Sequence, residues 1–145
     1  ELLADASVTI PEIGTIRATH PPVIVLTSIL MRVLHGPLRR SCLYPWIAYP
    51  TPEREVEIVR RRVKGSSETL AVQVANAVSR MRSSDVQKPP GVAESIDWLA
   101  ALSLLGIEQL DADAVDLTLG SVLKYSEDQE VIRAAGLEQL VGGSD

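Results

Sequence analysis

Two short stretches of polar residues in the first fifty residues have the residue types and positions for ligand binding or catalysis. Thr27 and Ser28 directly follow the apolar run VIVL at residues 23–26. Such a run is typical of a buried parallel strand, and ligands of open α/β sheets bind beyond the carboxyl ends of these strands. The two hydroxyls are therefore interpreted either as ligand-facing groups or as caps of a strand end, and the residues alone leave both interpretations open.

The second group is Arg39-Arg40-Ser41, which lies between a short helix expected at about 31–40 and a strand expected at 43–49. Basic residues at a helix C-terminus interact favourably with the helix dipole, which is one explanation for the arginines. The other is an arginine that reaches the phosphates of a nucleotide on a neighbouring subunit, where its charge stabilises phosphoryl transfer.

The sequence lacks the common catalytic and metal-binding motifs. It contains no GxxxxGK[ST] phosphate loop, no GxSxG nucleophile elbow, no HExxH and no CxxC. The single cysteine, Cys42, excludes an internal disulfide and a multi-cysteine metal site. His20 and His35 do not have the spacing of metal ligands, so we predict no metal site.

Composition narrows the class of protein further. Hydrophobic residues make up 46% of the 145 residues, so a packed core is expected. The net charge of −5 and the pI near 5.0 argue against a nucleic-acid partner, despite the cluster Arg60-Arg61-Arg62. The apolar runs are shorter than the ~20 residues of a membrane-spanning helix, and no targeting signal is visible. We therefore predict a cytoplasmic protein without membrane contact.

Up to about Tyr49 the pattern indicates an α/β segment. Alternating residues and a Pro-Glu-Ile-Gly turn predict a β-hairpin from Ser7 to Thr19. Two strand patterns follow at 23–26 and 43–49, on either side of the expected helix. Residues 1–6 have the character of the last turns of a helix, which we interpret as a sign that the chain is a fragment.

Beyond residue 50 only helix patterns are present. Thr51 is expected to cap a helix that begins at Pro52, and Asp111 to cap a later helix. Ser126 to Gln129 has the pattern of a capping box for a further helix. The helical spacing places these residues on inward faces: Val56, Val59, Val63, Leu70, Val74, Val78, Met81, Trp98, Leu102, Leu105, Val115, Leu119 and Val122.

The expected fold is thus an α/β fragment followed by an all-α unit of about four helices. We place the end of an α/β domain at residues 1–49, a helical domain at 50–141 and a frayed tail at 142–145.

Taken together, the pattern resembles the MoxR-type AAA+ ATPases. The resemblance rests on VTIPEIGTIRATHPPVIVLTS, LHGPLRRSCLYPWIAYPTPEREVEIVRRRV, KPPGVAESIDW and LGSVLKYSEDQE, which cover most of the chain. It implies an incomplete P-loop NTPase fold, in which Val23–Ser28 is the sensor-1 strand, Leu43–Tyr49 the last strand of the large domain, and Pro52 onward the helical lid. The Walker A and Walker B segments that bind ATP and Mg²⁺ lie upstream in such enzymes. We therefore expect this chain alone neither to bind ATP tightly nor to hydrolyse it.

The chain departs from the family at the positions that the resemblance implies are catalytic. Ile29, directly after Ser28, stands where the family carries the sensor-1 asparagine, and Ser41 stands where it carries the arginine finger. Arg40 is one residue early, and one residue on a helix turns a side chain by about 100°. A sensor-2 arginine is also missing from the lid segment that would contact the nucleotide, in which we single out Gly91, Glu94 and Ser95.

The resemblance implies that the complete protein is a hexameric ring that uses ATP to remodel or mature client proteins, in a chaperone-like role. It also implies a von Willebrand factor A domain protein as partner. The departures at Ile29 and Ser41 support a different hypothesis, that of a degenerate, non-catalytic AAA-like module for assembly or protein interaction. A third hypothesis is that residues 50–145 act alone as a protein-binding unit.

Overall fold

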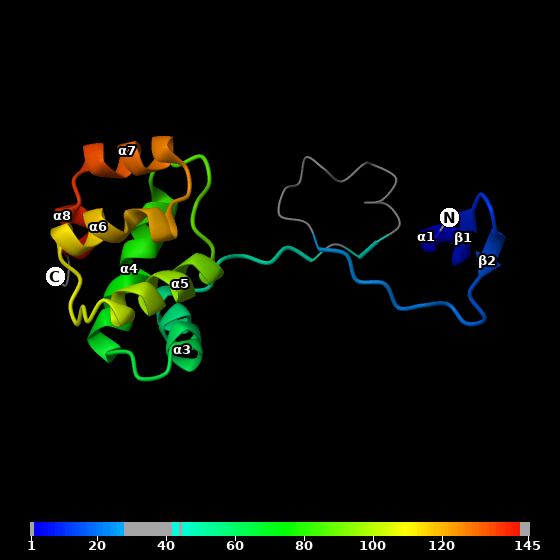
Figure 1. The fold of residues 1–145 in the computed structure, drawn as a ribbon, viewed down its shortest axis with the longest axis horizontal. Coiled ribbons are helices and arrows are strands. Elements are labelled where there is room, and N and C mark those ends of the chain that lie inside the picture. The colour runs from blue at the N-terminus through cyan, green and yellow to red at the C-terminus, as the bar shows by residue number, and fades with distance from the viewer. Residues whose placement is uncertain (1, 28–41, 44, 143–145) are drawn as a thin grey trace. The chain divides into compact units, whose positions relative to one another are not determined.

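The computed structural model describes residues 2–27, 42–43 and 45–142 of the chain. The chain separates into two compact units, with the division between Ile47 and Ala48. Figure 1 shows the elements that make up each unit. The helix predicted at 31–40 lies outside the described residues.

The first unit contains a short helix and an antiparallel hairpin. Their bounds are α1 Leu2–Asp5, β1 Ser7–Ile10 and β2 Gly14–Arg17 (Figure 1). The strands pair Val8 with Ile16 and Thr9 with Thr15, and the two threonine hydroxyls lie 3.0 Å apart. The hairpin predicted for this segment is therefore confirmed.

The strands predicted at Val23–Leu26 and Leu43–Tyr49 are not present among the described residues. The side chains of Val23 and Leu43 are 96% and 97% exposed, so the prediction of buried strands is wrong for this structure. A strand needs neighbours that accept its backbone hydrogen bonds and cover its faces. Within the described part of the chain the sheet consists of β1 and β2, and neither segment pairs with it.

The second unit is helical, so the coarse fold is a hairpin followed by a mostly helical region. The helices are α3 Pro52–Arg62, α4 Glu68–Ser83, α5 Val92–Leu104, α6 Ala112–Val122, α7 Ser126–Ala135 and α8 Glu138–Val141. Five of them have ten residues or more: the four expected and the further helix predicted at Ser126, which is α7.

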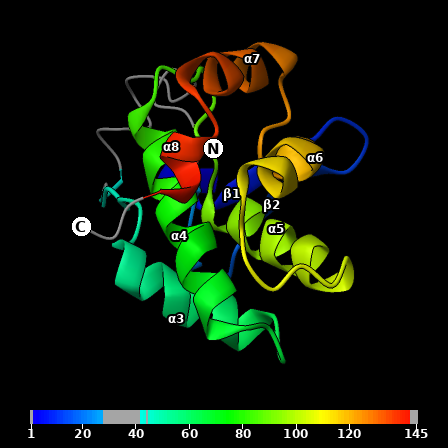
Figure 2. The same ribbon diagram turned by 90° about the vertical axis from the view of Figure 1, so that its left-hand side faces the viewer.

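Helix α4 is the centre of this unit. It contacts α3, α5 and α8, while α6 contacts α5, α7 and α8 (Figure 2). Seven of the sixteen residues of α4 are buried, more than in any other helix described. The four residues predicted to share its inward face are all at most 1% exposed: Leu70, Val74, Val78 and Met81.

Two helix starts agree with the predicted caps. Thr51 accepts a hydrogen bond from the backbone nitrogen of Arg54 at 3.4 Å, and α3 begins at Pro52. Asp111 accepts one from the backbone nitrogen of Ala114 at 2.7 Å. These caps satisfy N–H groups that have no partner within the helix.

The C-terminus of α5 corrects the prediction for Leu105, which is 58% exposed rather than inward. Gly106 has φ of +72°, and its N–H donates to the carbonyl of Ser103. The N–H of Ile107 donates to the carbonyl of Leu102, which completes a Schellman turn. The turn directs Leu105 outward and packs Ile107 against the core instead.

The capping box predicted at Ser126 is also not formed, although α7 exists. The helix already includes Ser126, and the residue before it, Tyr125, makes no side-chain cap. Gln129 donates to the carbonyl of Leu123, and the carboxylate of Asp128 binds backbone N–H groups of another segment. The side chain of Gln129, which the pattern assigns to the capping box, is therefore used for another hydrogen bond.

A first prediction concerns the indole of Trp98, which is fully buried and donates to the hydroxyl of Thr118 at 2.7 Å. Thr118→Val keeps the shape of the side chain but leaves this donor without a partner, so unfolding should become easier by about 1–3 kcal/mol. Chemical denaturation followed by circular dichroism measures the change. Thr69→Val, at an exposed position of α4, should stay within about 0.5 kcal/mol of the parent. Equal losses in both variants would contradict the assignment.

A second prediction concerns Glu53 in the first turn of α3. Hydrogen bonds from its own backbone N–H and from the side chain of Thr51 lower the pKa of Glu53 below its ordinary value of 4.5. Because the folded-state pKa is lowered, the stabilisation is present above the unfolded-state value and is lost as the pH falls through the folded-state value. Glu53→Gln should therefore be less stable than the parent at neutral pH, and the difference should vanish in acid. A difference that persists in acid would contradict this origin.

Candidate functional site

Four of the predicted site residues, Ser28, Ile29, Arg40 and Ser41, lie outside the described residues. Their roles therefore stay predictions. The other three, Gly91, Glu94 and Ser95, lie together at the start of α5, and the site can be built around them.

The N-terminus of α5 is closed by its own residues. A carboxylate oxygen of Glu94 accepts a hydrogen bond from the backbone nitrogen of Gly91 at 3.0 Å. Ser95 is fully buried, and its hydroxyl lies 3.3 Å from the carbonyl oxygen of Gly91. The structure thus brings the three residues together, with their polar groups directed at one another and at the interior.

The hydroxyl of Ser95 leads to a buried ion pair. It donates to Oε1 of Glu55 at 2.5 Å, and Glu55 is fully buried on α3. Arg82, near the end of α4, binds both oxygens of the same carboxylate, with Nη1–Oε2 and Nη2–Oε1 distances of 2.5 and 2.9 Å. The side chain of Arg82 is only 9% exposed. This fork is the two-point geometry in which a guanidinium binds a carboxylate most strongly.

Arg82 makes two more contacts besides this pair. Its Nε donates to the carbonyl oxygen of Pro90 at 2.8 Å, in the loop that precedes α5. Its guanidinium carbon lies 4.3 Å from the centre of the Tyr49 ring, which is within the range of a cation–π contact. One side chain therefore joins α3, the start of α5 and the first residues of the second unit.

The other end of the loop before α5 is bound by Asp128. The carboxylate of this buried α7 residue accepts hydrogen bonds from the backbone nitrogens of Gln87 and Lys88, at 2.7 and 3.1 Å. The ammonium of Lys88 also lies 5.6 Å from the ring centre of Tyr125. Residues 87–90 are thus bound by Asp128 at one end and by Arg82 at the other.

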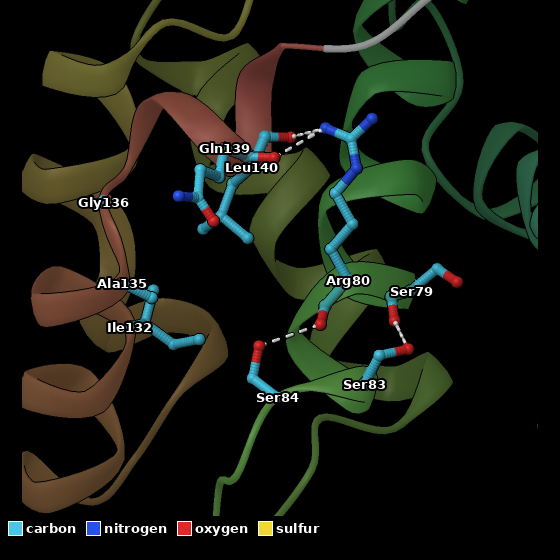
Figure 3. Close-up of a pocket in the computed structure, with 9 residues that line it drawn as sticks. All are labelled: Ser79, Arg80, Ser83, Ser84, Ile132, Ala135, Gly136, Gln139 and Leu140. Atoms are coloured by element: carbon cyan, nitrogen blue, oxygen red, sulfur yellow. Dashed lines mark hydrogen bonds between the residues drawn. The ribbon is translucent and has the colours of Figure 1, made fainter.

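A separate cavity of about 290 Å³ lies between α4 and the helices α7 and α8 (Figure 3). Nη1 of Arg80 donates across it to the carbonyls of Gln139 and Leu140, at 2.9 and 2.8 Å. The hydroxyls of Ser83 and Ser84 donate to main-chain carbonyls of α4. Its lining is Ser79, Arg80, Ser83, Ser84, Ile132, Ala135, Gly136, Gln139 and Leu140. This set contains no acid, histidine or cysteine for acid–base chemistry, so the cavity is a weaker candidate than the start of α5.

Sequence reasoning missed Glu55 and Arg82, although a signal was present. Glu55 lies four residues before Val59, and Arg82 lies four residues after Val78, so each charge is in register with an inward apolar face. A charge at such a position must be paired or exposed. Opposite charges on the inward faces of two consecutive helices therefore indicate a buried pair.

Comparison of the chain with protein-family models, with curated proteins and with solved structures gives no match. In the described ranges no three His, Cys, Asp or Glu residues are grouped so that they could hold a metal ion. None of the helices described is both long and apolar enough to cross a membrane.

A third prediction tests the buried pair. Glu55→Gln leaves the charge of Arg82 without a counter-charge in a buried place, so the free energy of unfolding should fall by about 3–5 kcal/mol. Glu57→Gln removes the carboxylate of the exposed Arg54–Glu57 pair on the same helix and should cost less than about 1 kcal/mol. Urea denaturation of both variants measures the difference. Similar small losses in both would show that Arg82 does not depend on Glu55.

Proposed function

We propose that the chain is part of a MoxR-type AAA+ ATPase, with the helical unit as its lid. The observation that supports this most is the order of the elements. A hairpin is followed by a helical unit that begins at Pro52, and α5 of that unit begins directly after the sequence Lys-Pro-Pro-Gly. This is the order that the resemblance implies for the end of the large domain and for the lid.

The exposed apolar segments of the first unit agree with this proposal. Val25, Trp46 and Ile47 are 82%, 68% and 88% exposed. Burial of apolar surface stabilises a protein by about 25 cal/mol for each Å² removed from water, and these exposed side chains lack that stabilisation. Further parts of a larger protein, such as the rest of an AAA+ large domain, would cover these side chains.

We expect this chain alone not to form an ATP site. The sequence has no phosphate loop, and at the start of α5 the N–H of Gly91 and the hydroxyl of Ser95 are engaged within the unit. In the proposed enzyme, ATP with Mg²⁺ supplies the phosphoryl-transfer chemistry, held by Walker segments of the large domain. The contribution of this chain is mechanical, because a close-packed core lets α3–α8 move as one body.

Ile29 and Ser41 favour a second candidate function. An isoleucine side chain can neither donate nor accept a hydrogen bond, so it cannot orient a water molecule as the sensor-1 asparagine does. With the finger arginine also replaced, the ring would assemble and bind partners without hydrolysis. This alternative is the degenerate, non-catalytic AAA-like module.

A fourth prediction separates the two candidates. The natural full-length gene product that carries this chain should form a ring and hydrolyse ATP in a Mg²⁺-dependent manner, measured as phosphate release together with the mass of the assembly. Ring assembly without phosphate release would contradict the enzyme and favour the non-catalytic module. A protein that neither assembles nor binds ATP would exclude both.

The double variant Ile29→Asn with Ser41→Arg tests the cause of low or absent hydrolysis in the same full-length protein. If the two departures limit catalysis, phosphate release should rise by about tenfold or more, as expected for restoring groups that act on the transition state. An unchanged rate would show that these positions do not limit it. Ile29→Gln is a matched control, because its side chain carries the same amide as asparagine but is one methylene longer.

A further inference from the structure

We propose that Tyr49, Arg82, Glu55 and Ser95 form a relay through which the first residues of the helical unit control the start of α5. Each link in this relay is a direct contact. The ring of Tyr49 lies against the guanidinium of Arg82, Arg82 binds both oxygens of Glu55, and Glu55 accepts the hydrogen bond of Ser95.

The outer end of the relay is accessible. Tyr49 follows the division between the units by only two residues and is 53% exposed, whereas the three other members are at most 9% exposed in their side chains or fully buried. Tyr49 is not part of the hydrophobic core of the unit. Its ring contacts the guanidinium of Arg82, so we expect a displacement of the segment before α3 to act on Arg82.

The inner end is rigid because a guanidinium is planar. Nε of Arg82 donates to the carbonyl of Pro90, while both terminal nitrogens donate to Glu55. A tilt of the plane changes these three hydrogen bonds together, which a flexible ammonium would not do. The loop before α5 and the carboxylate that holds Ser95 therefore respond to the same movement.

A buried ion pair that served stability alone would not need this arrangement. An apolar pair of similar volume is often as stable as a buried ion pair or more so. Arg82 joins three segments and carries an exposed ring against its guanidinium, which suggests transmission instead. The two interpretations differ in one measurable quantity, the coupling between Tyr49 and Ser95.

A double-mutant cycle on the full chain measures this coupling. Tyr49→Leu removes the ring but keeps an apolar side chain, and Ser95→Ala removes the hydroxyl. If the relay operates, the folding equilibrium constant of the double variant should differ by about threefold or more from the product of the two single effects. Tyr49→Leu combined with Thr118→Val, which acts on a separate hydrogen bond, should multiply within about twofold.

Hydrogen exchange on Tyr49→Leu alone is the second measurement, and it does not require the Ser95 variant to fold. Within residues 91–95, the amides of Gly91 and Ser95 are hydrogen-bonded, and their exchange should accelerate by about threefold or more relative to the amides of α6, because local opening at the start of α5 becomes easier. Tyr49→Phe keeps the ring and should exchange like the parent. Unchanged exchange at 91–95 in Tyr49→Leu, or equal acceleration in α6, would overturn the proposal whatever the cycle gives.

Discussion

The bidentate contact between Glu55 and Arg82 is the interaction on which the arrangement of α3, α4 and α5 depends. Removing two charges from water is costly, and the structure offsets the cost with several hydrogen bonds. Glu55 accepts three, two from Arg82 and one from Ser95, and Arg82 donates a third to Pro90. No buried side-chain polar atom in the described residues is without a partner. The two-point hydrogen bonding has a fixed direction. Helices joined by it cannot slide past one another as they could across a purely apolar contact.

The loop between α4 and α5 connects the Glu55–Arg82 contact with the candidate site at the start of α5. Two consecutive prolines at 89 and 90 limit its backbone, Asp128 binds its first residues and Arg82 its last. The place where α5 begins is therefore set by α3, α4 and α7 together. Under the proposed function this is the segment that faces the nucleotide, and its rigidity would let a contact there move the whole lid.

The sequence predicted those parts of the fold that depend on neighbours along the chain. The caps at Thr51 and Asp111 and the inward face of α4 follow from spacing within one helix, and the structure has them as predicted. Predictions failed where other hydrogen bonds replace those that the local pattern predicts. Leu105 is directed outward by a Schellman turn, and Gln129 donates to the carbonyl of Leu123 instead of completing a capping box with Ser126.

The site shows the same limit. The grouping of Gly91, Glu94 and Ser95 follows from their closeness in sequence, whereas the pairing of Glu55 with Arg82 joins residues 27 positions apart. Periodicity places both charges inward, but it cannot say which partner each will meet. The strands predicted at Val23–Leu26 and Leu43–Tyr49 fail for a related reason, because the pattern of a strand does not supply the neighbours that the strand requires.

The two candidate functions place different demands on the helical unit, and the buried pair bears on the choice between them. A module that only assembles needs a stable body, and for stability alone an apolar pair is often equivalent to a buried ion pair. A lid must also respond at the start of α5, through contacts that have more than one arrangement. The proposed relay joins the exposed ring of Tyr49 to the buried hydroxyl of Ser95 through polar contacts, whereas Val74 and Trp98 are fully buried in the apolar core. The helical unit therefore carries a feature suited to a moving part, which favours the lid even though Ile29 and Ser41 depart from the catalytic pattern.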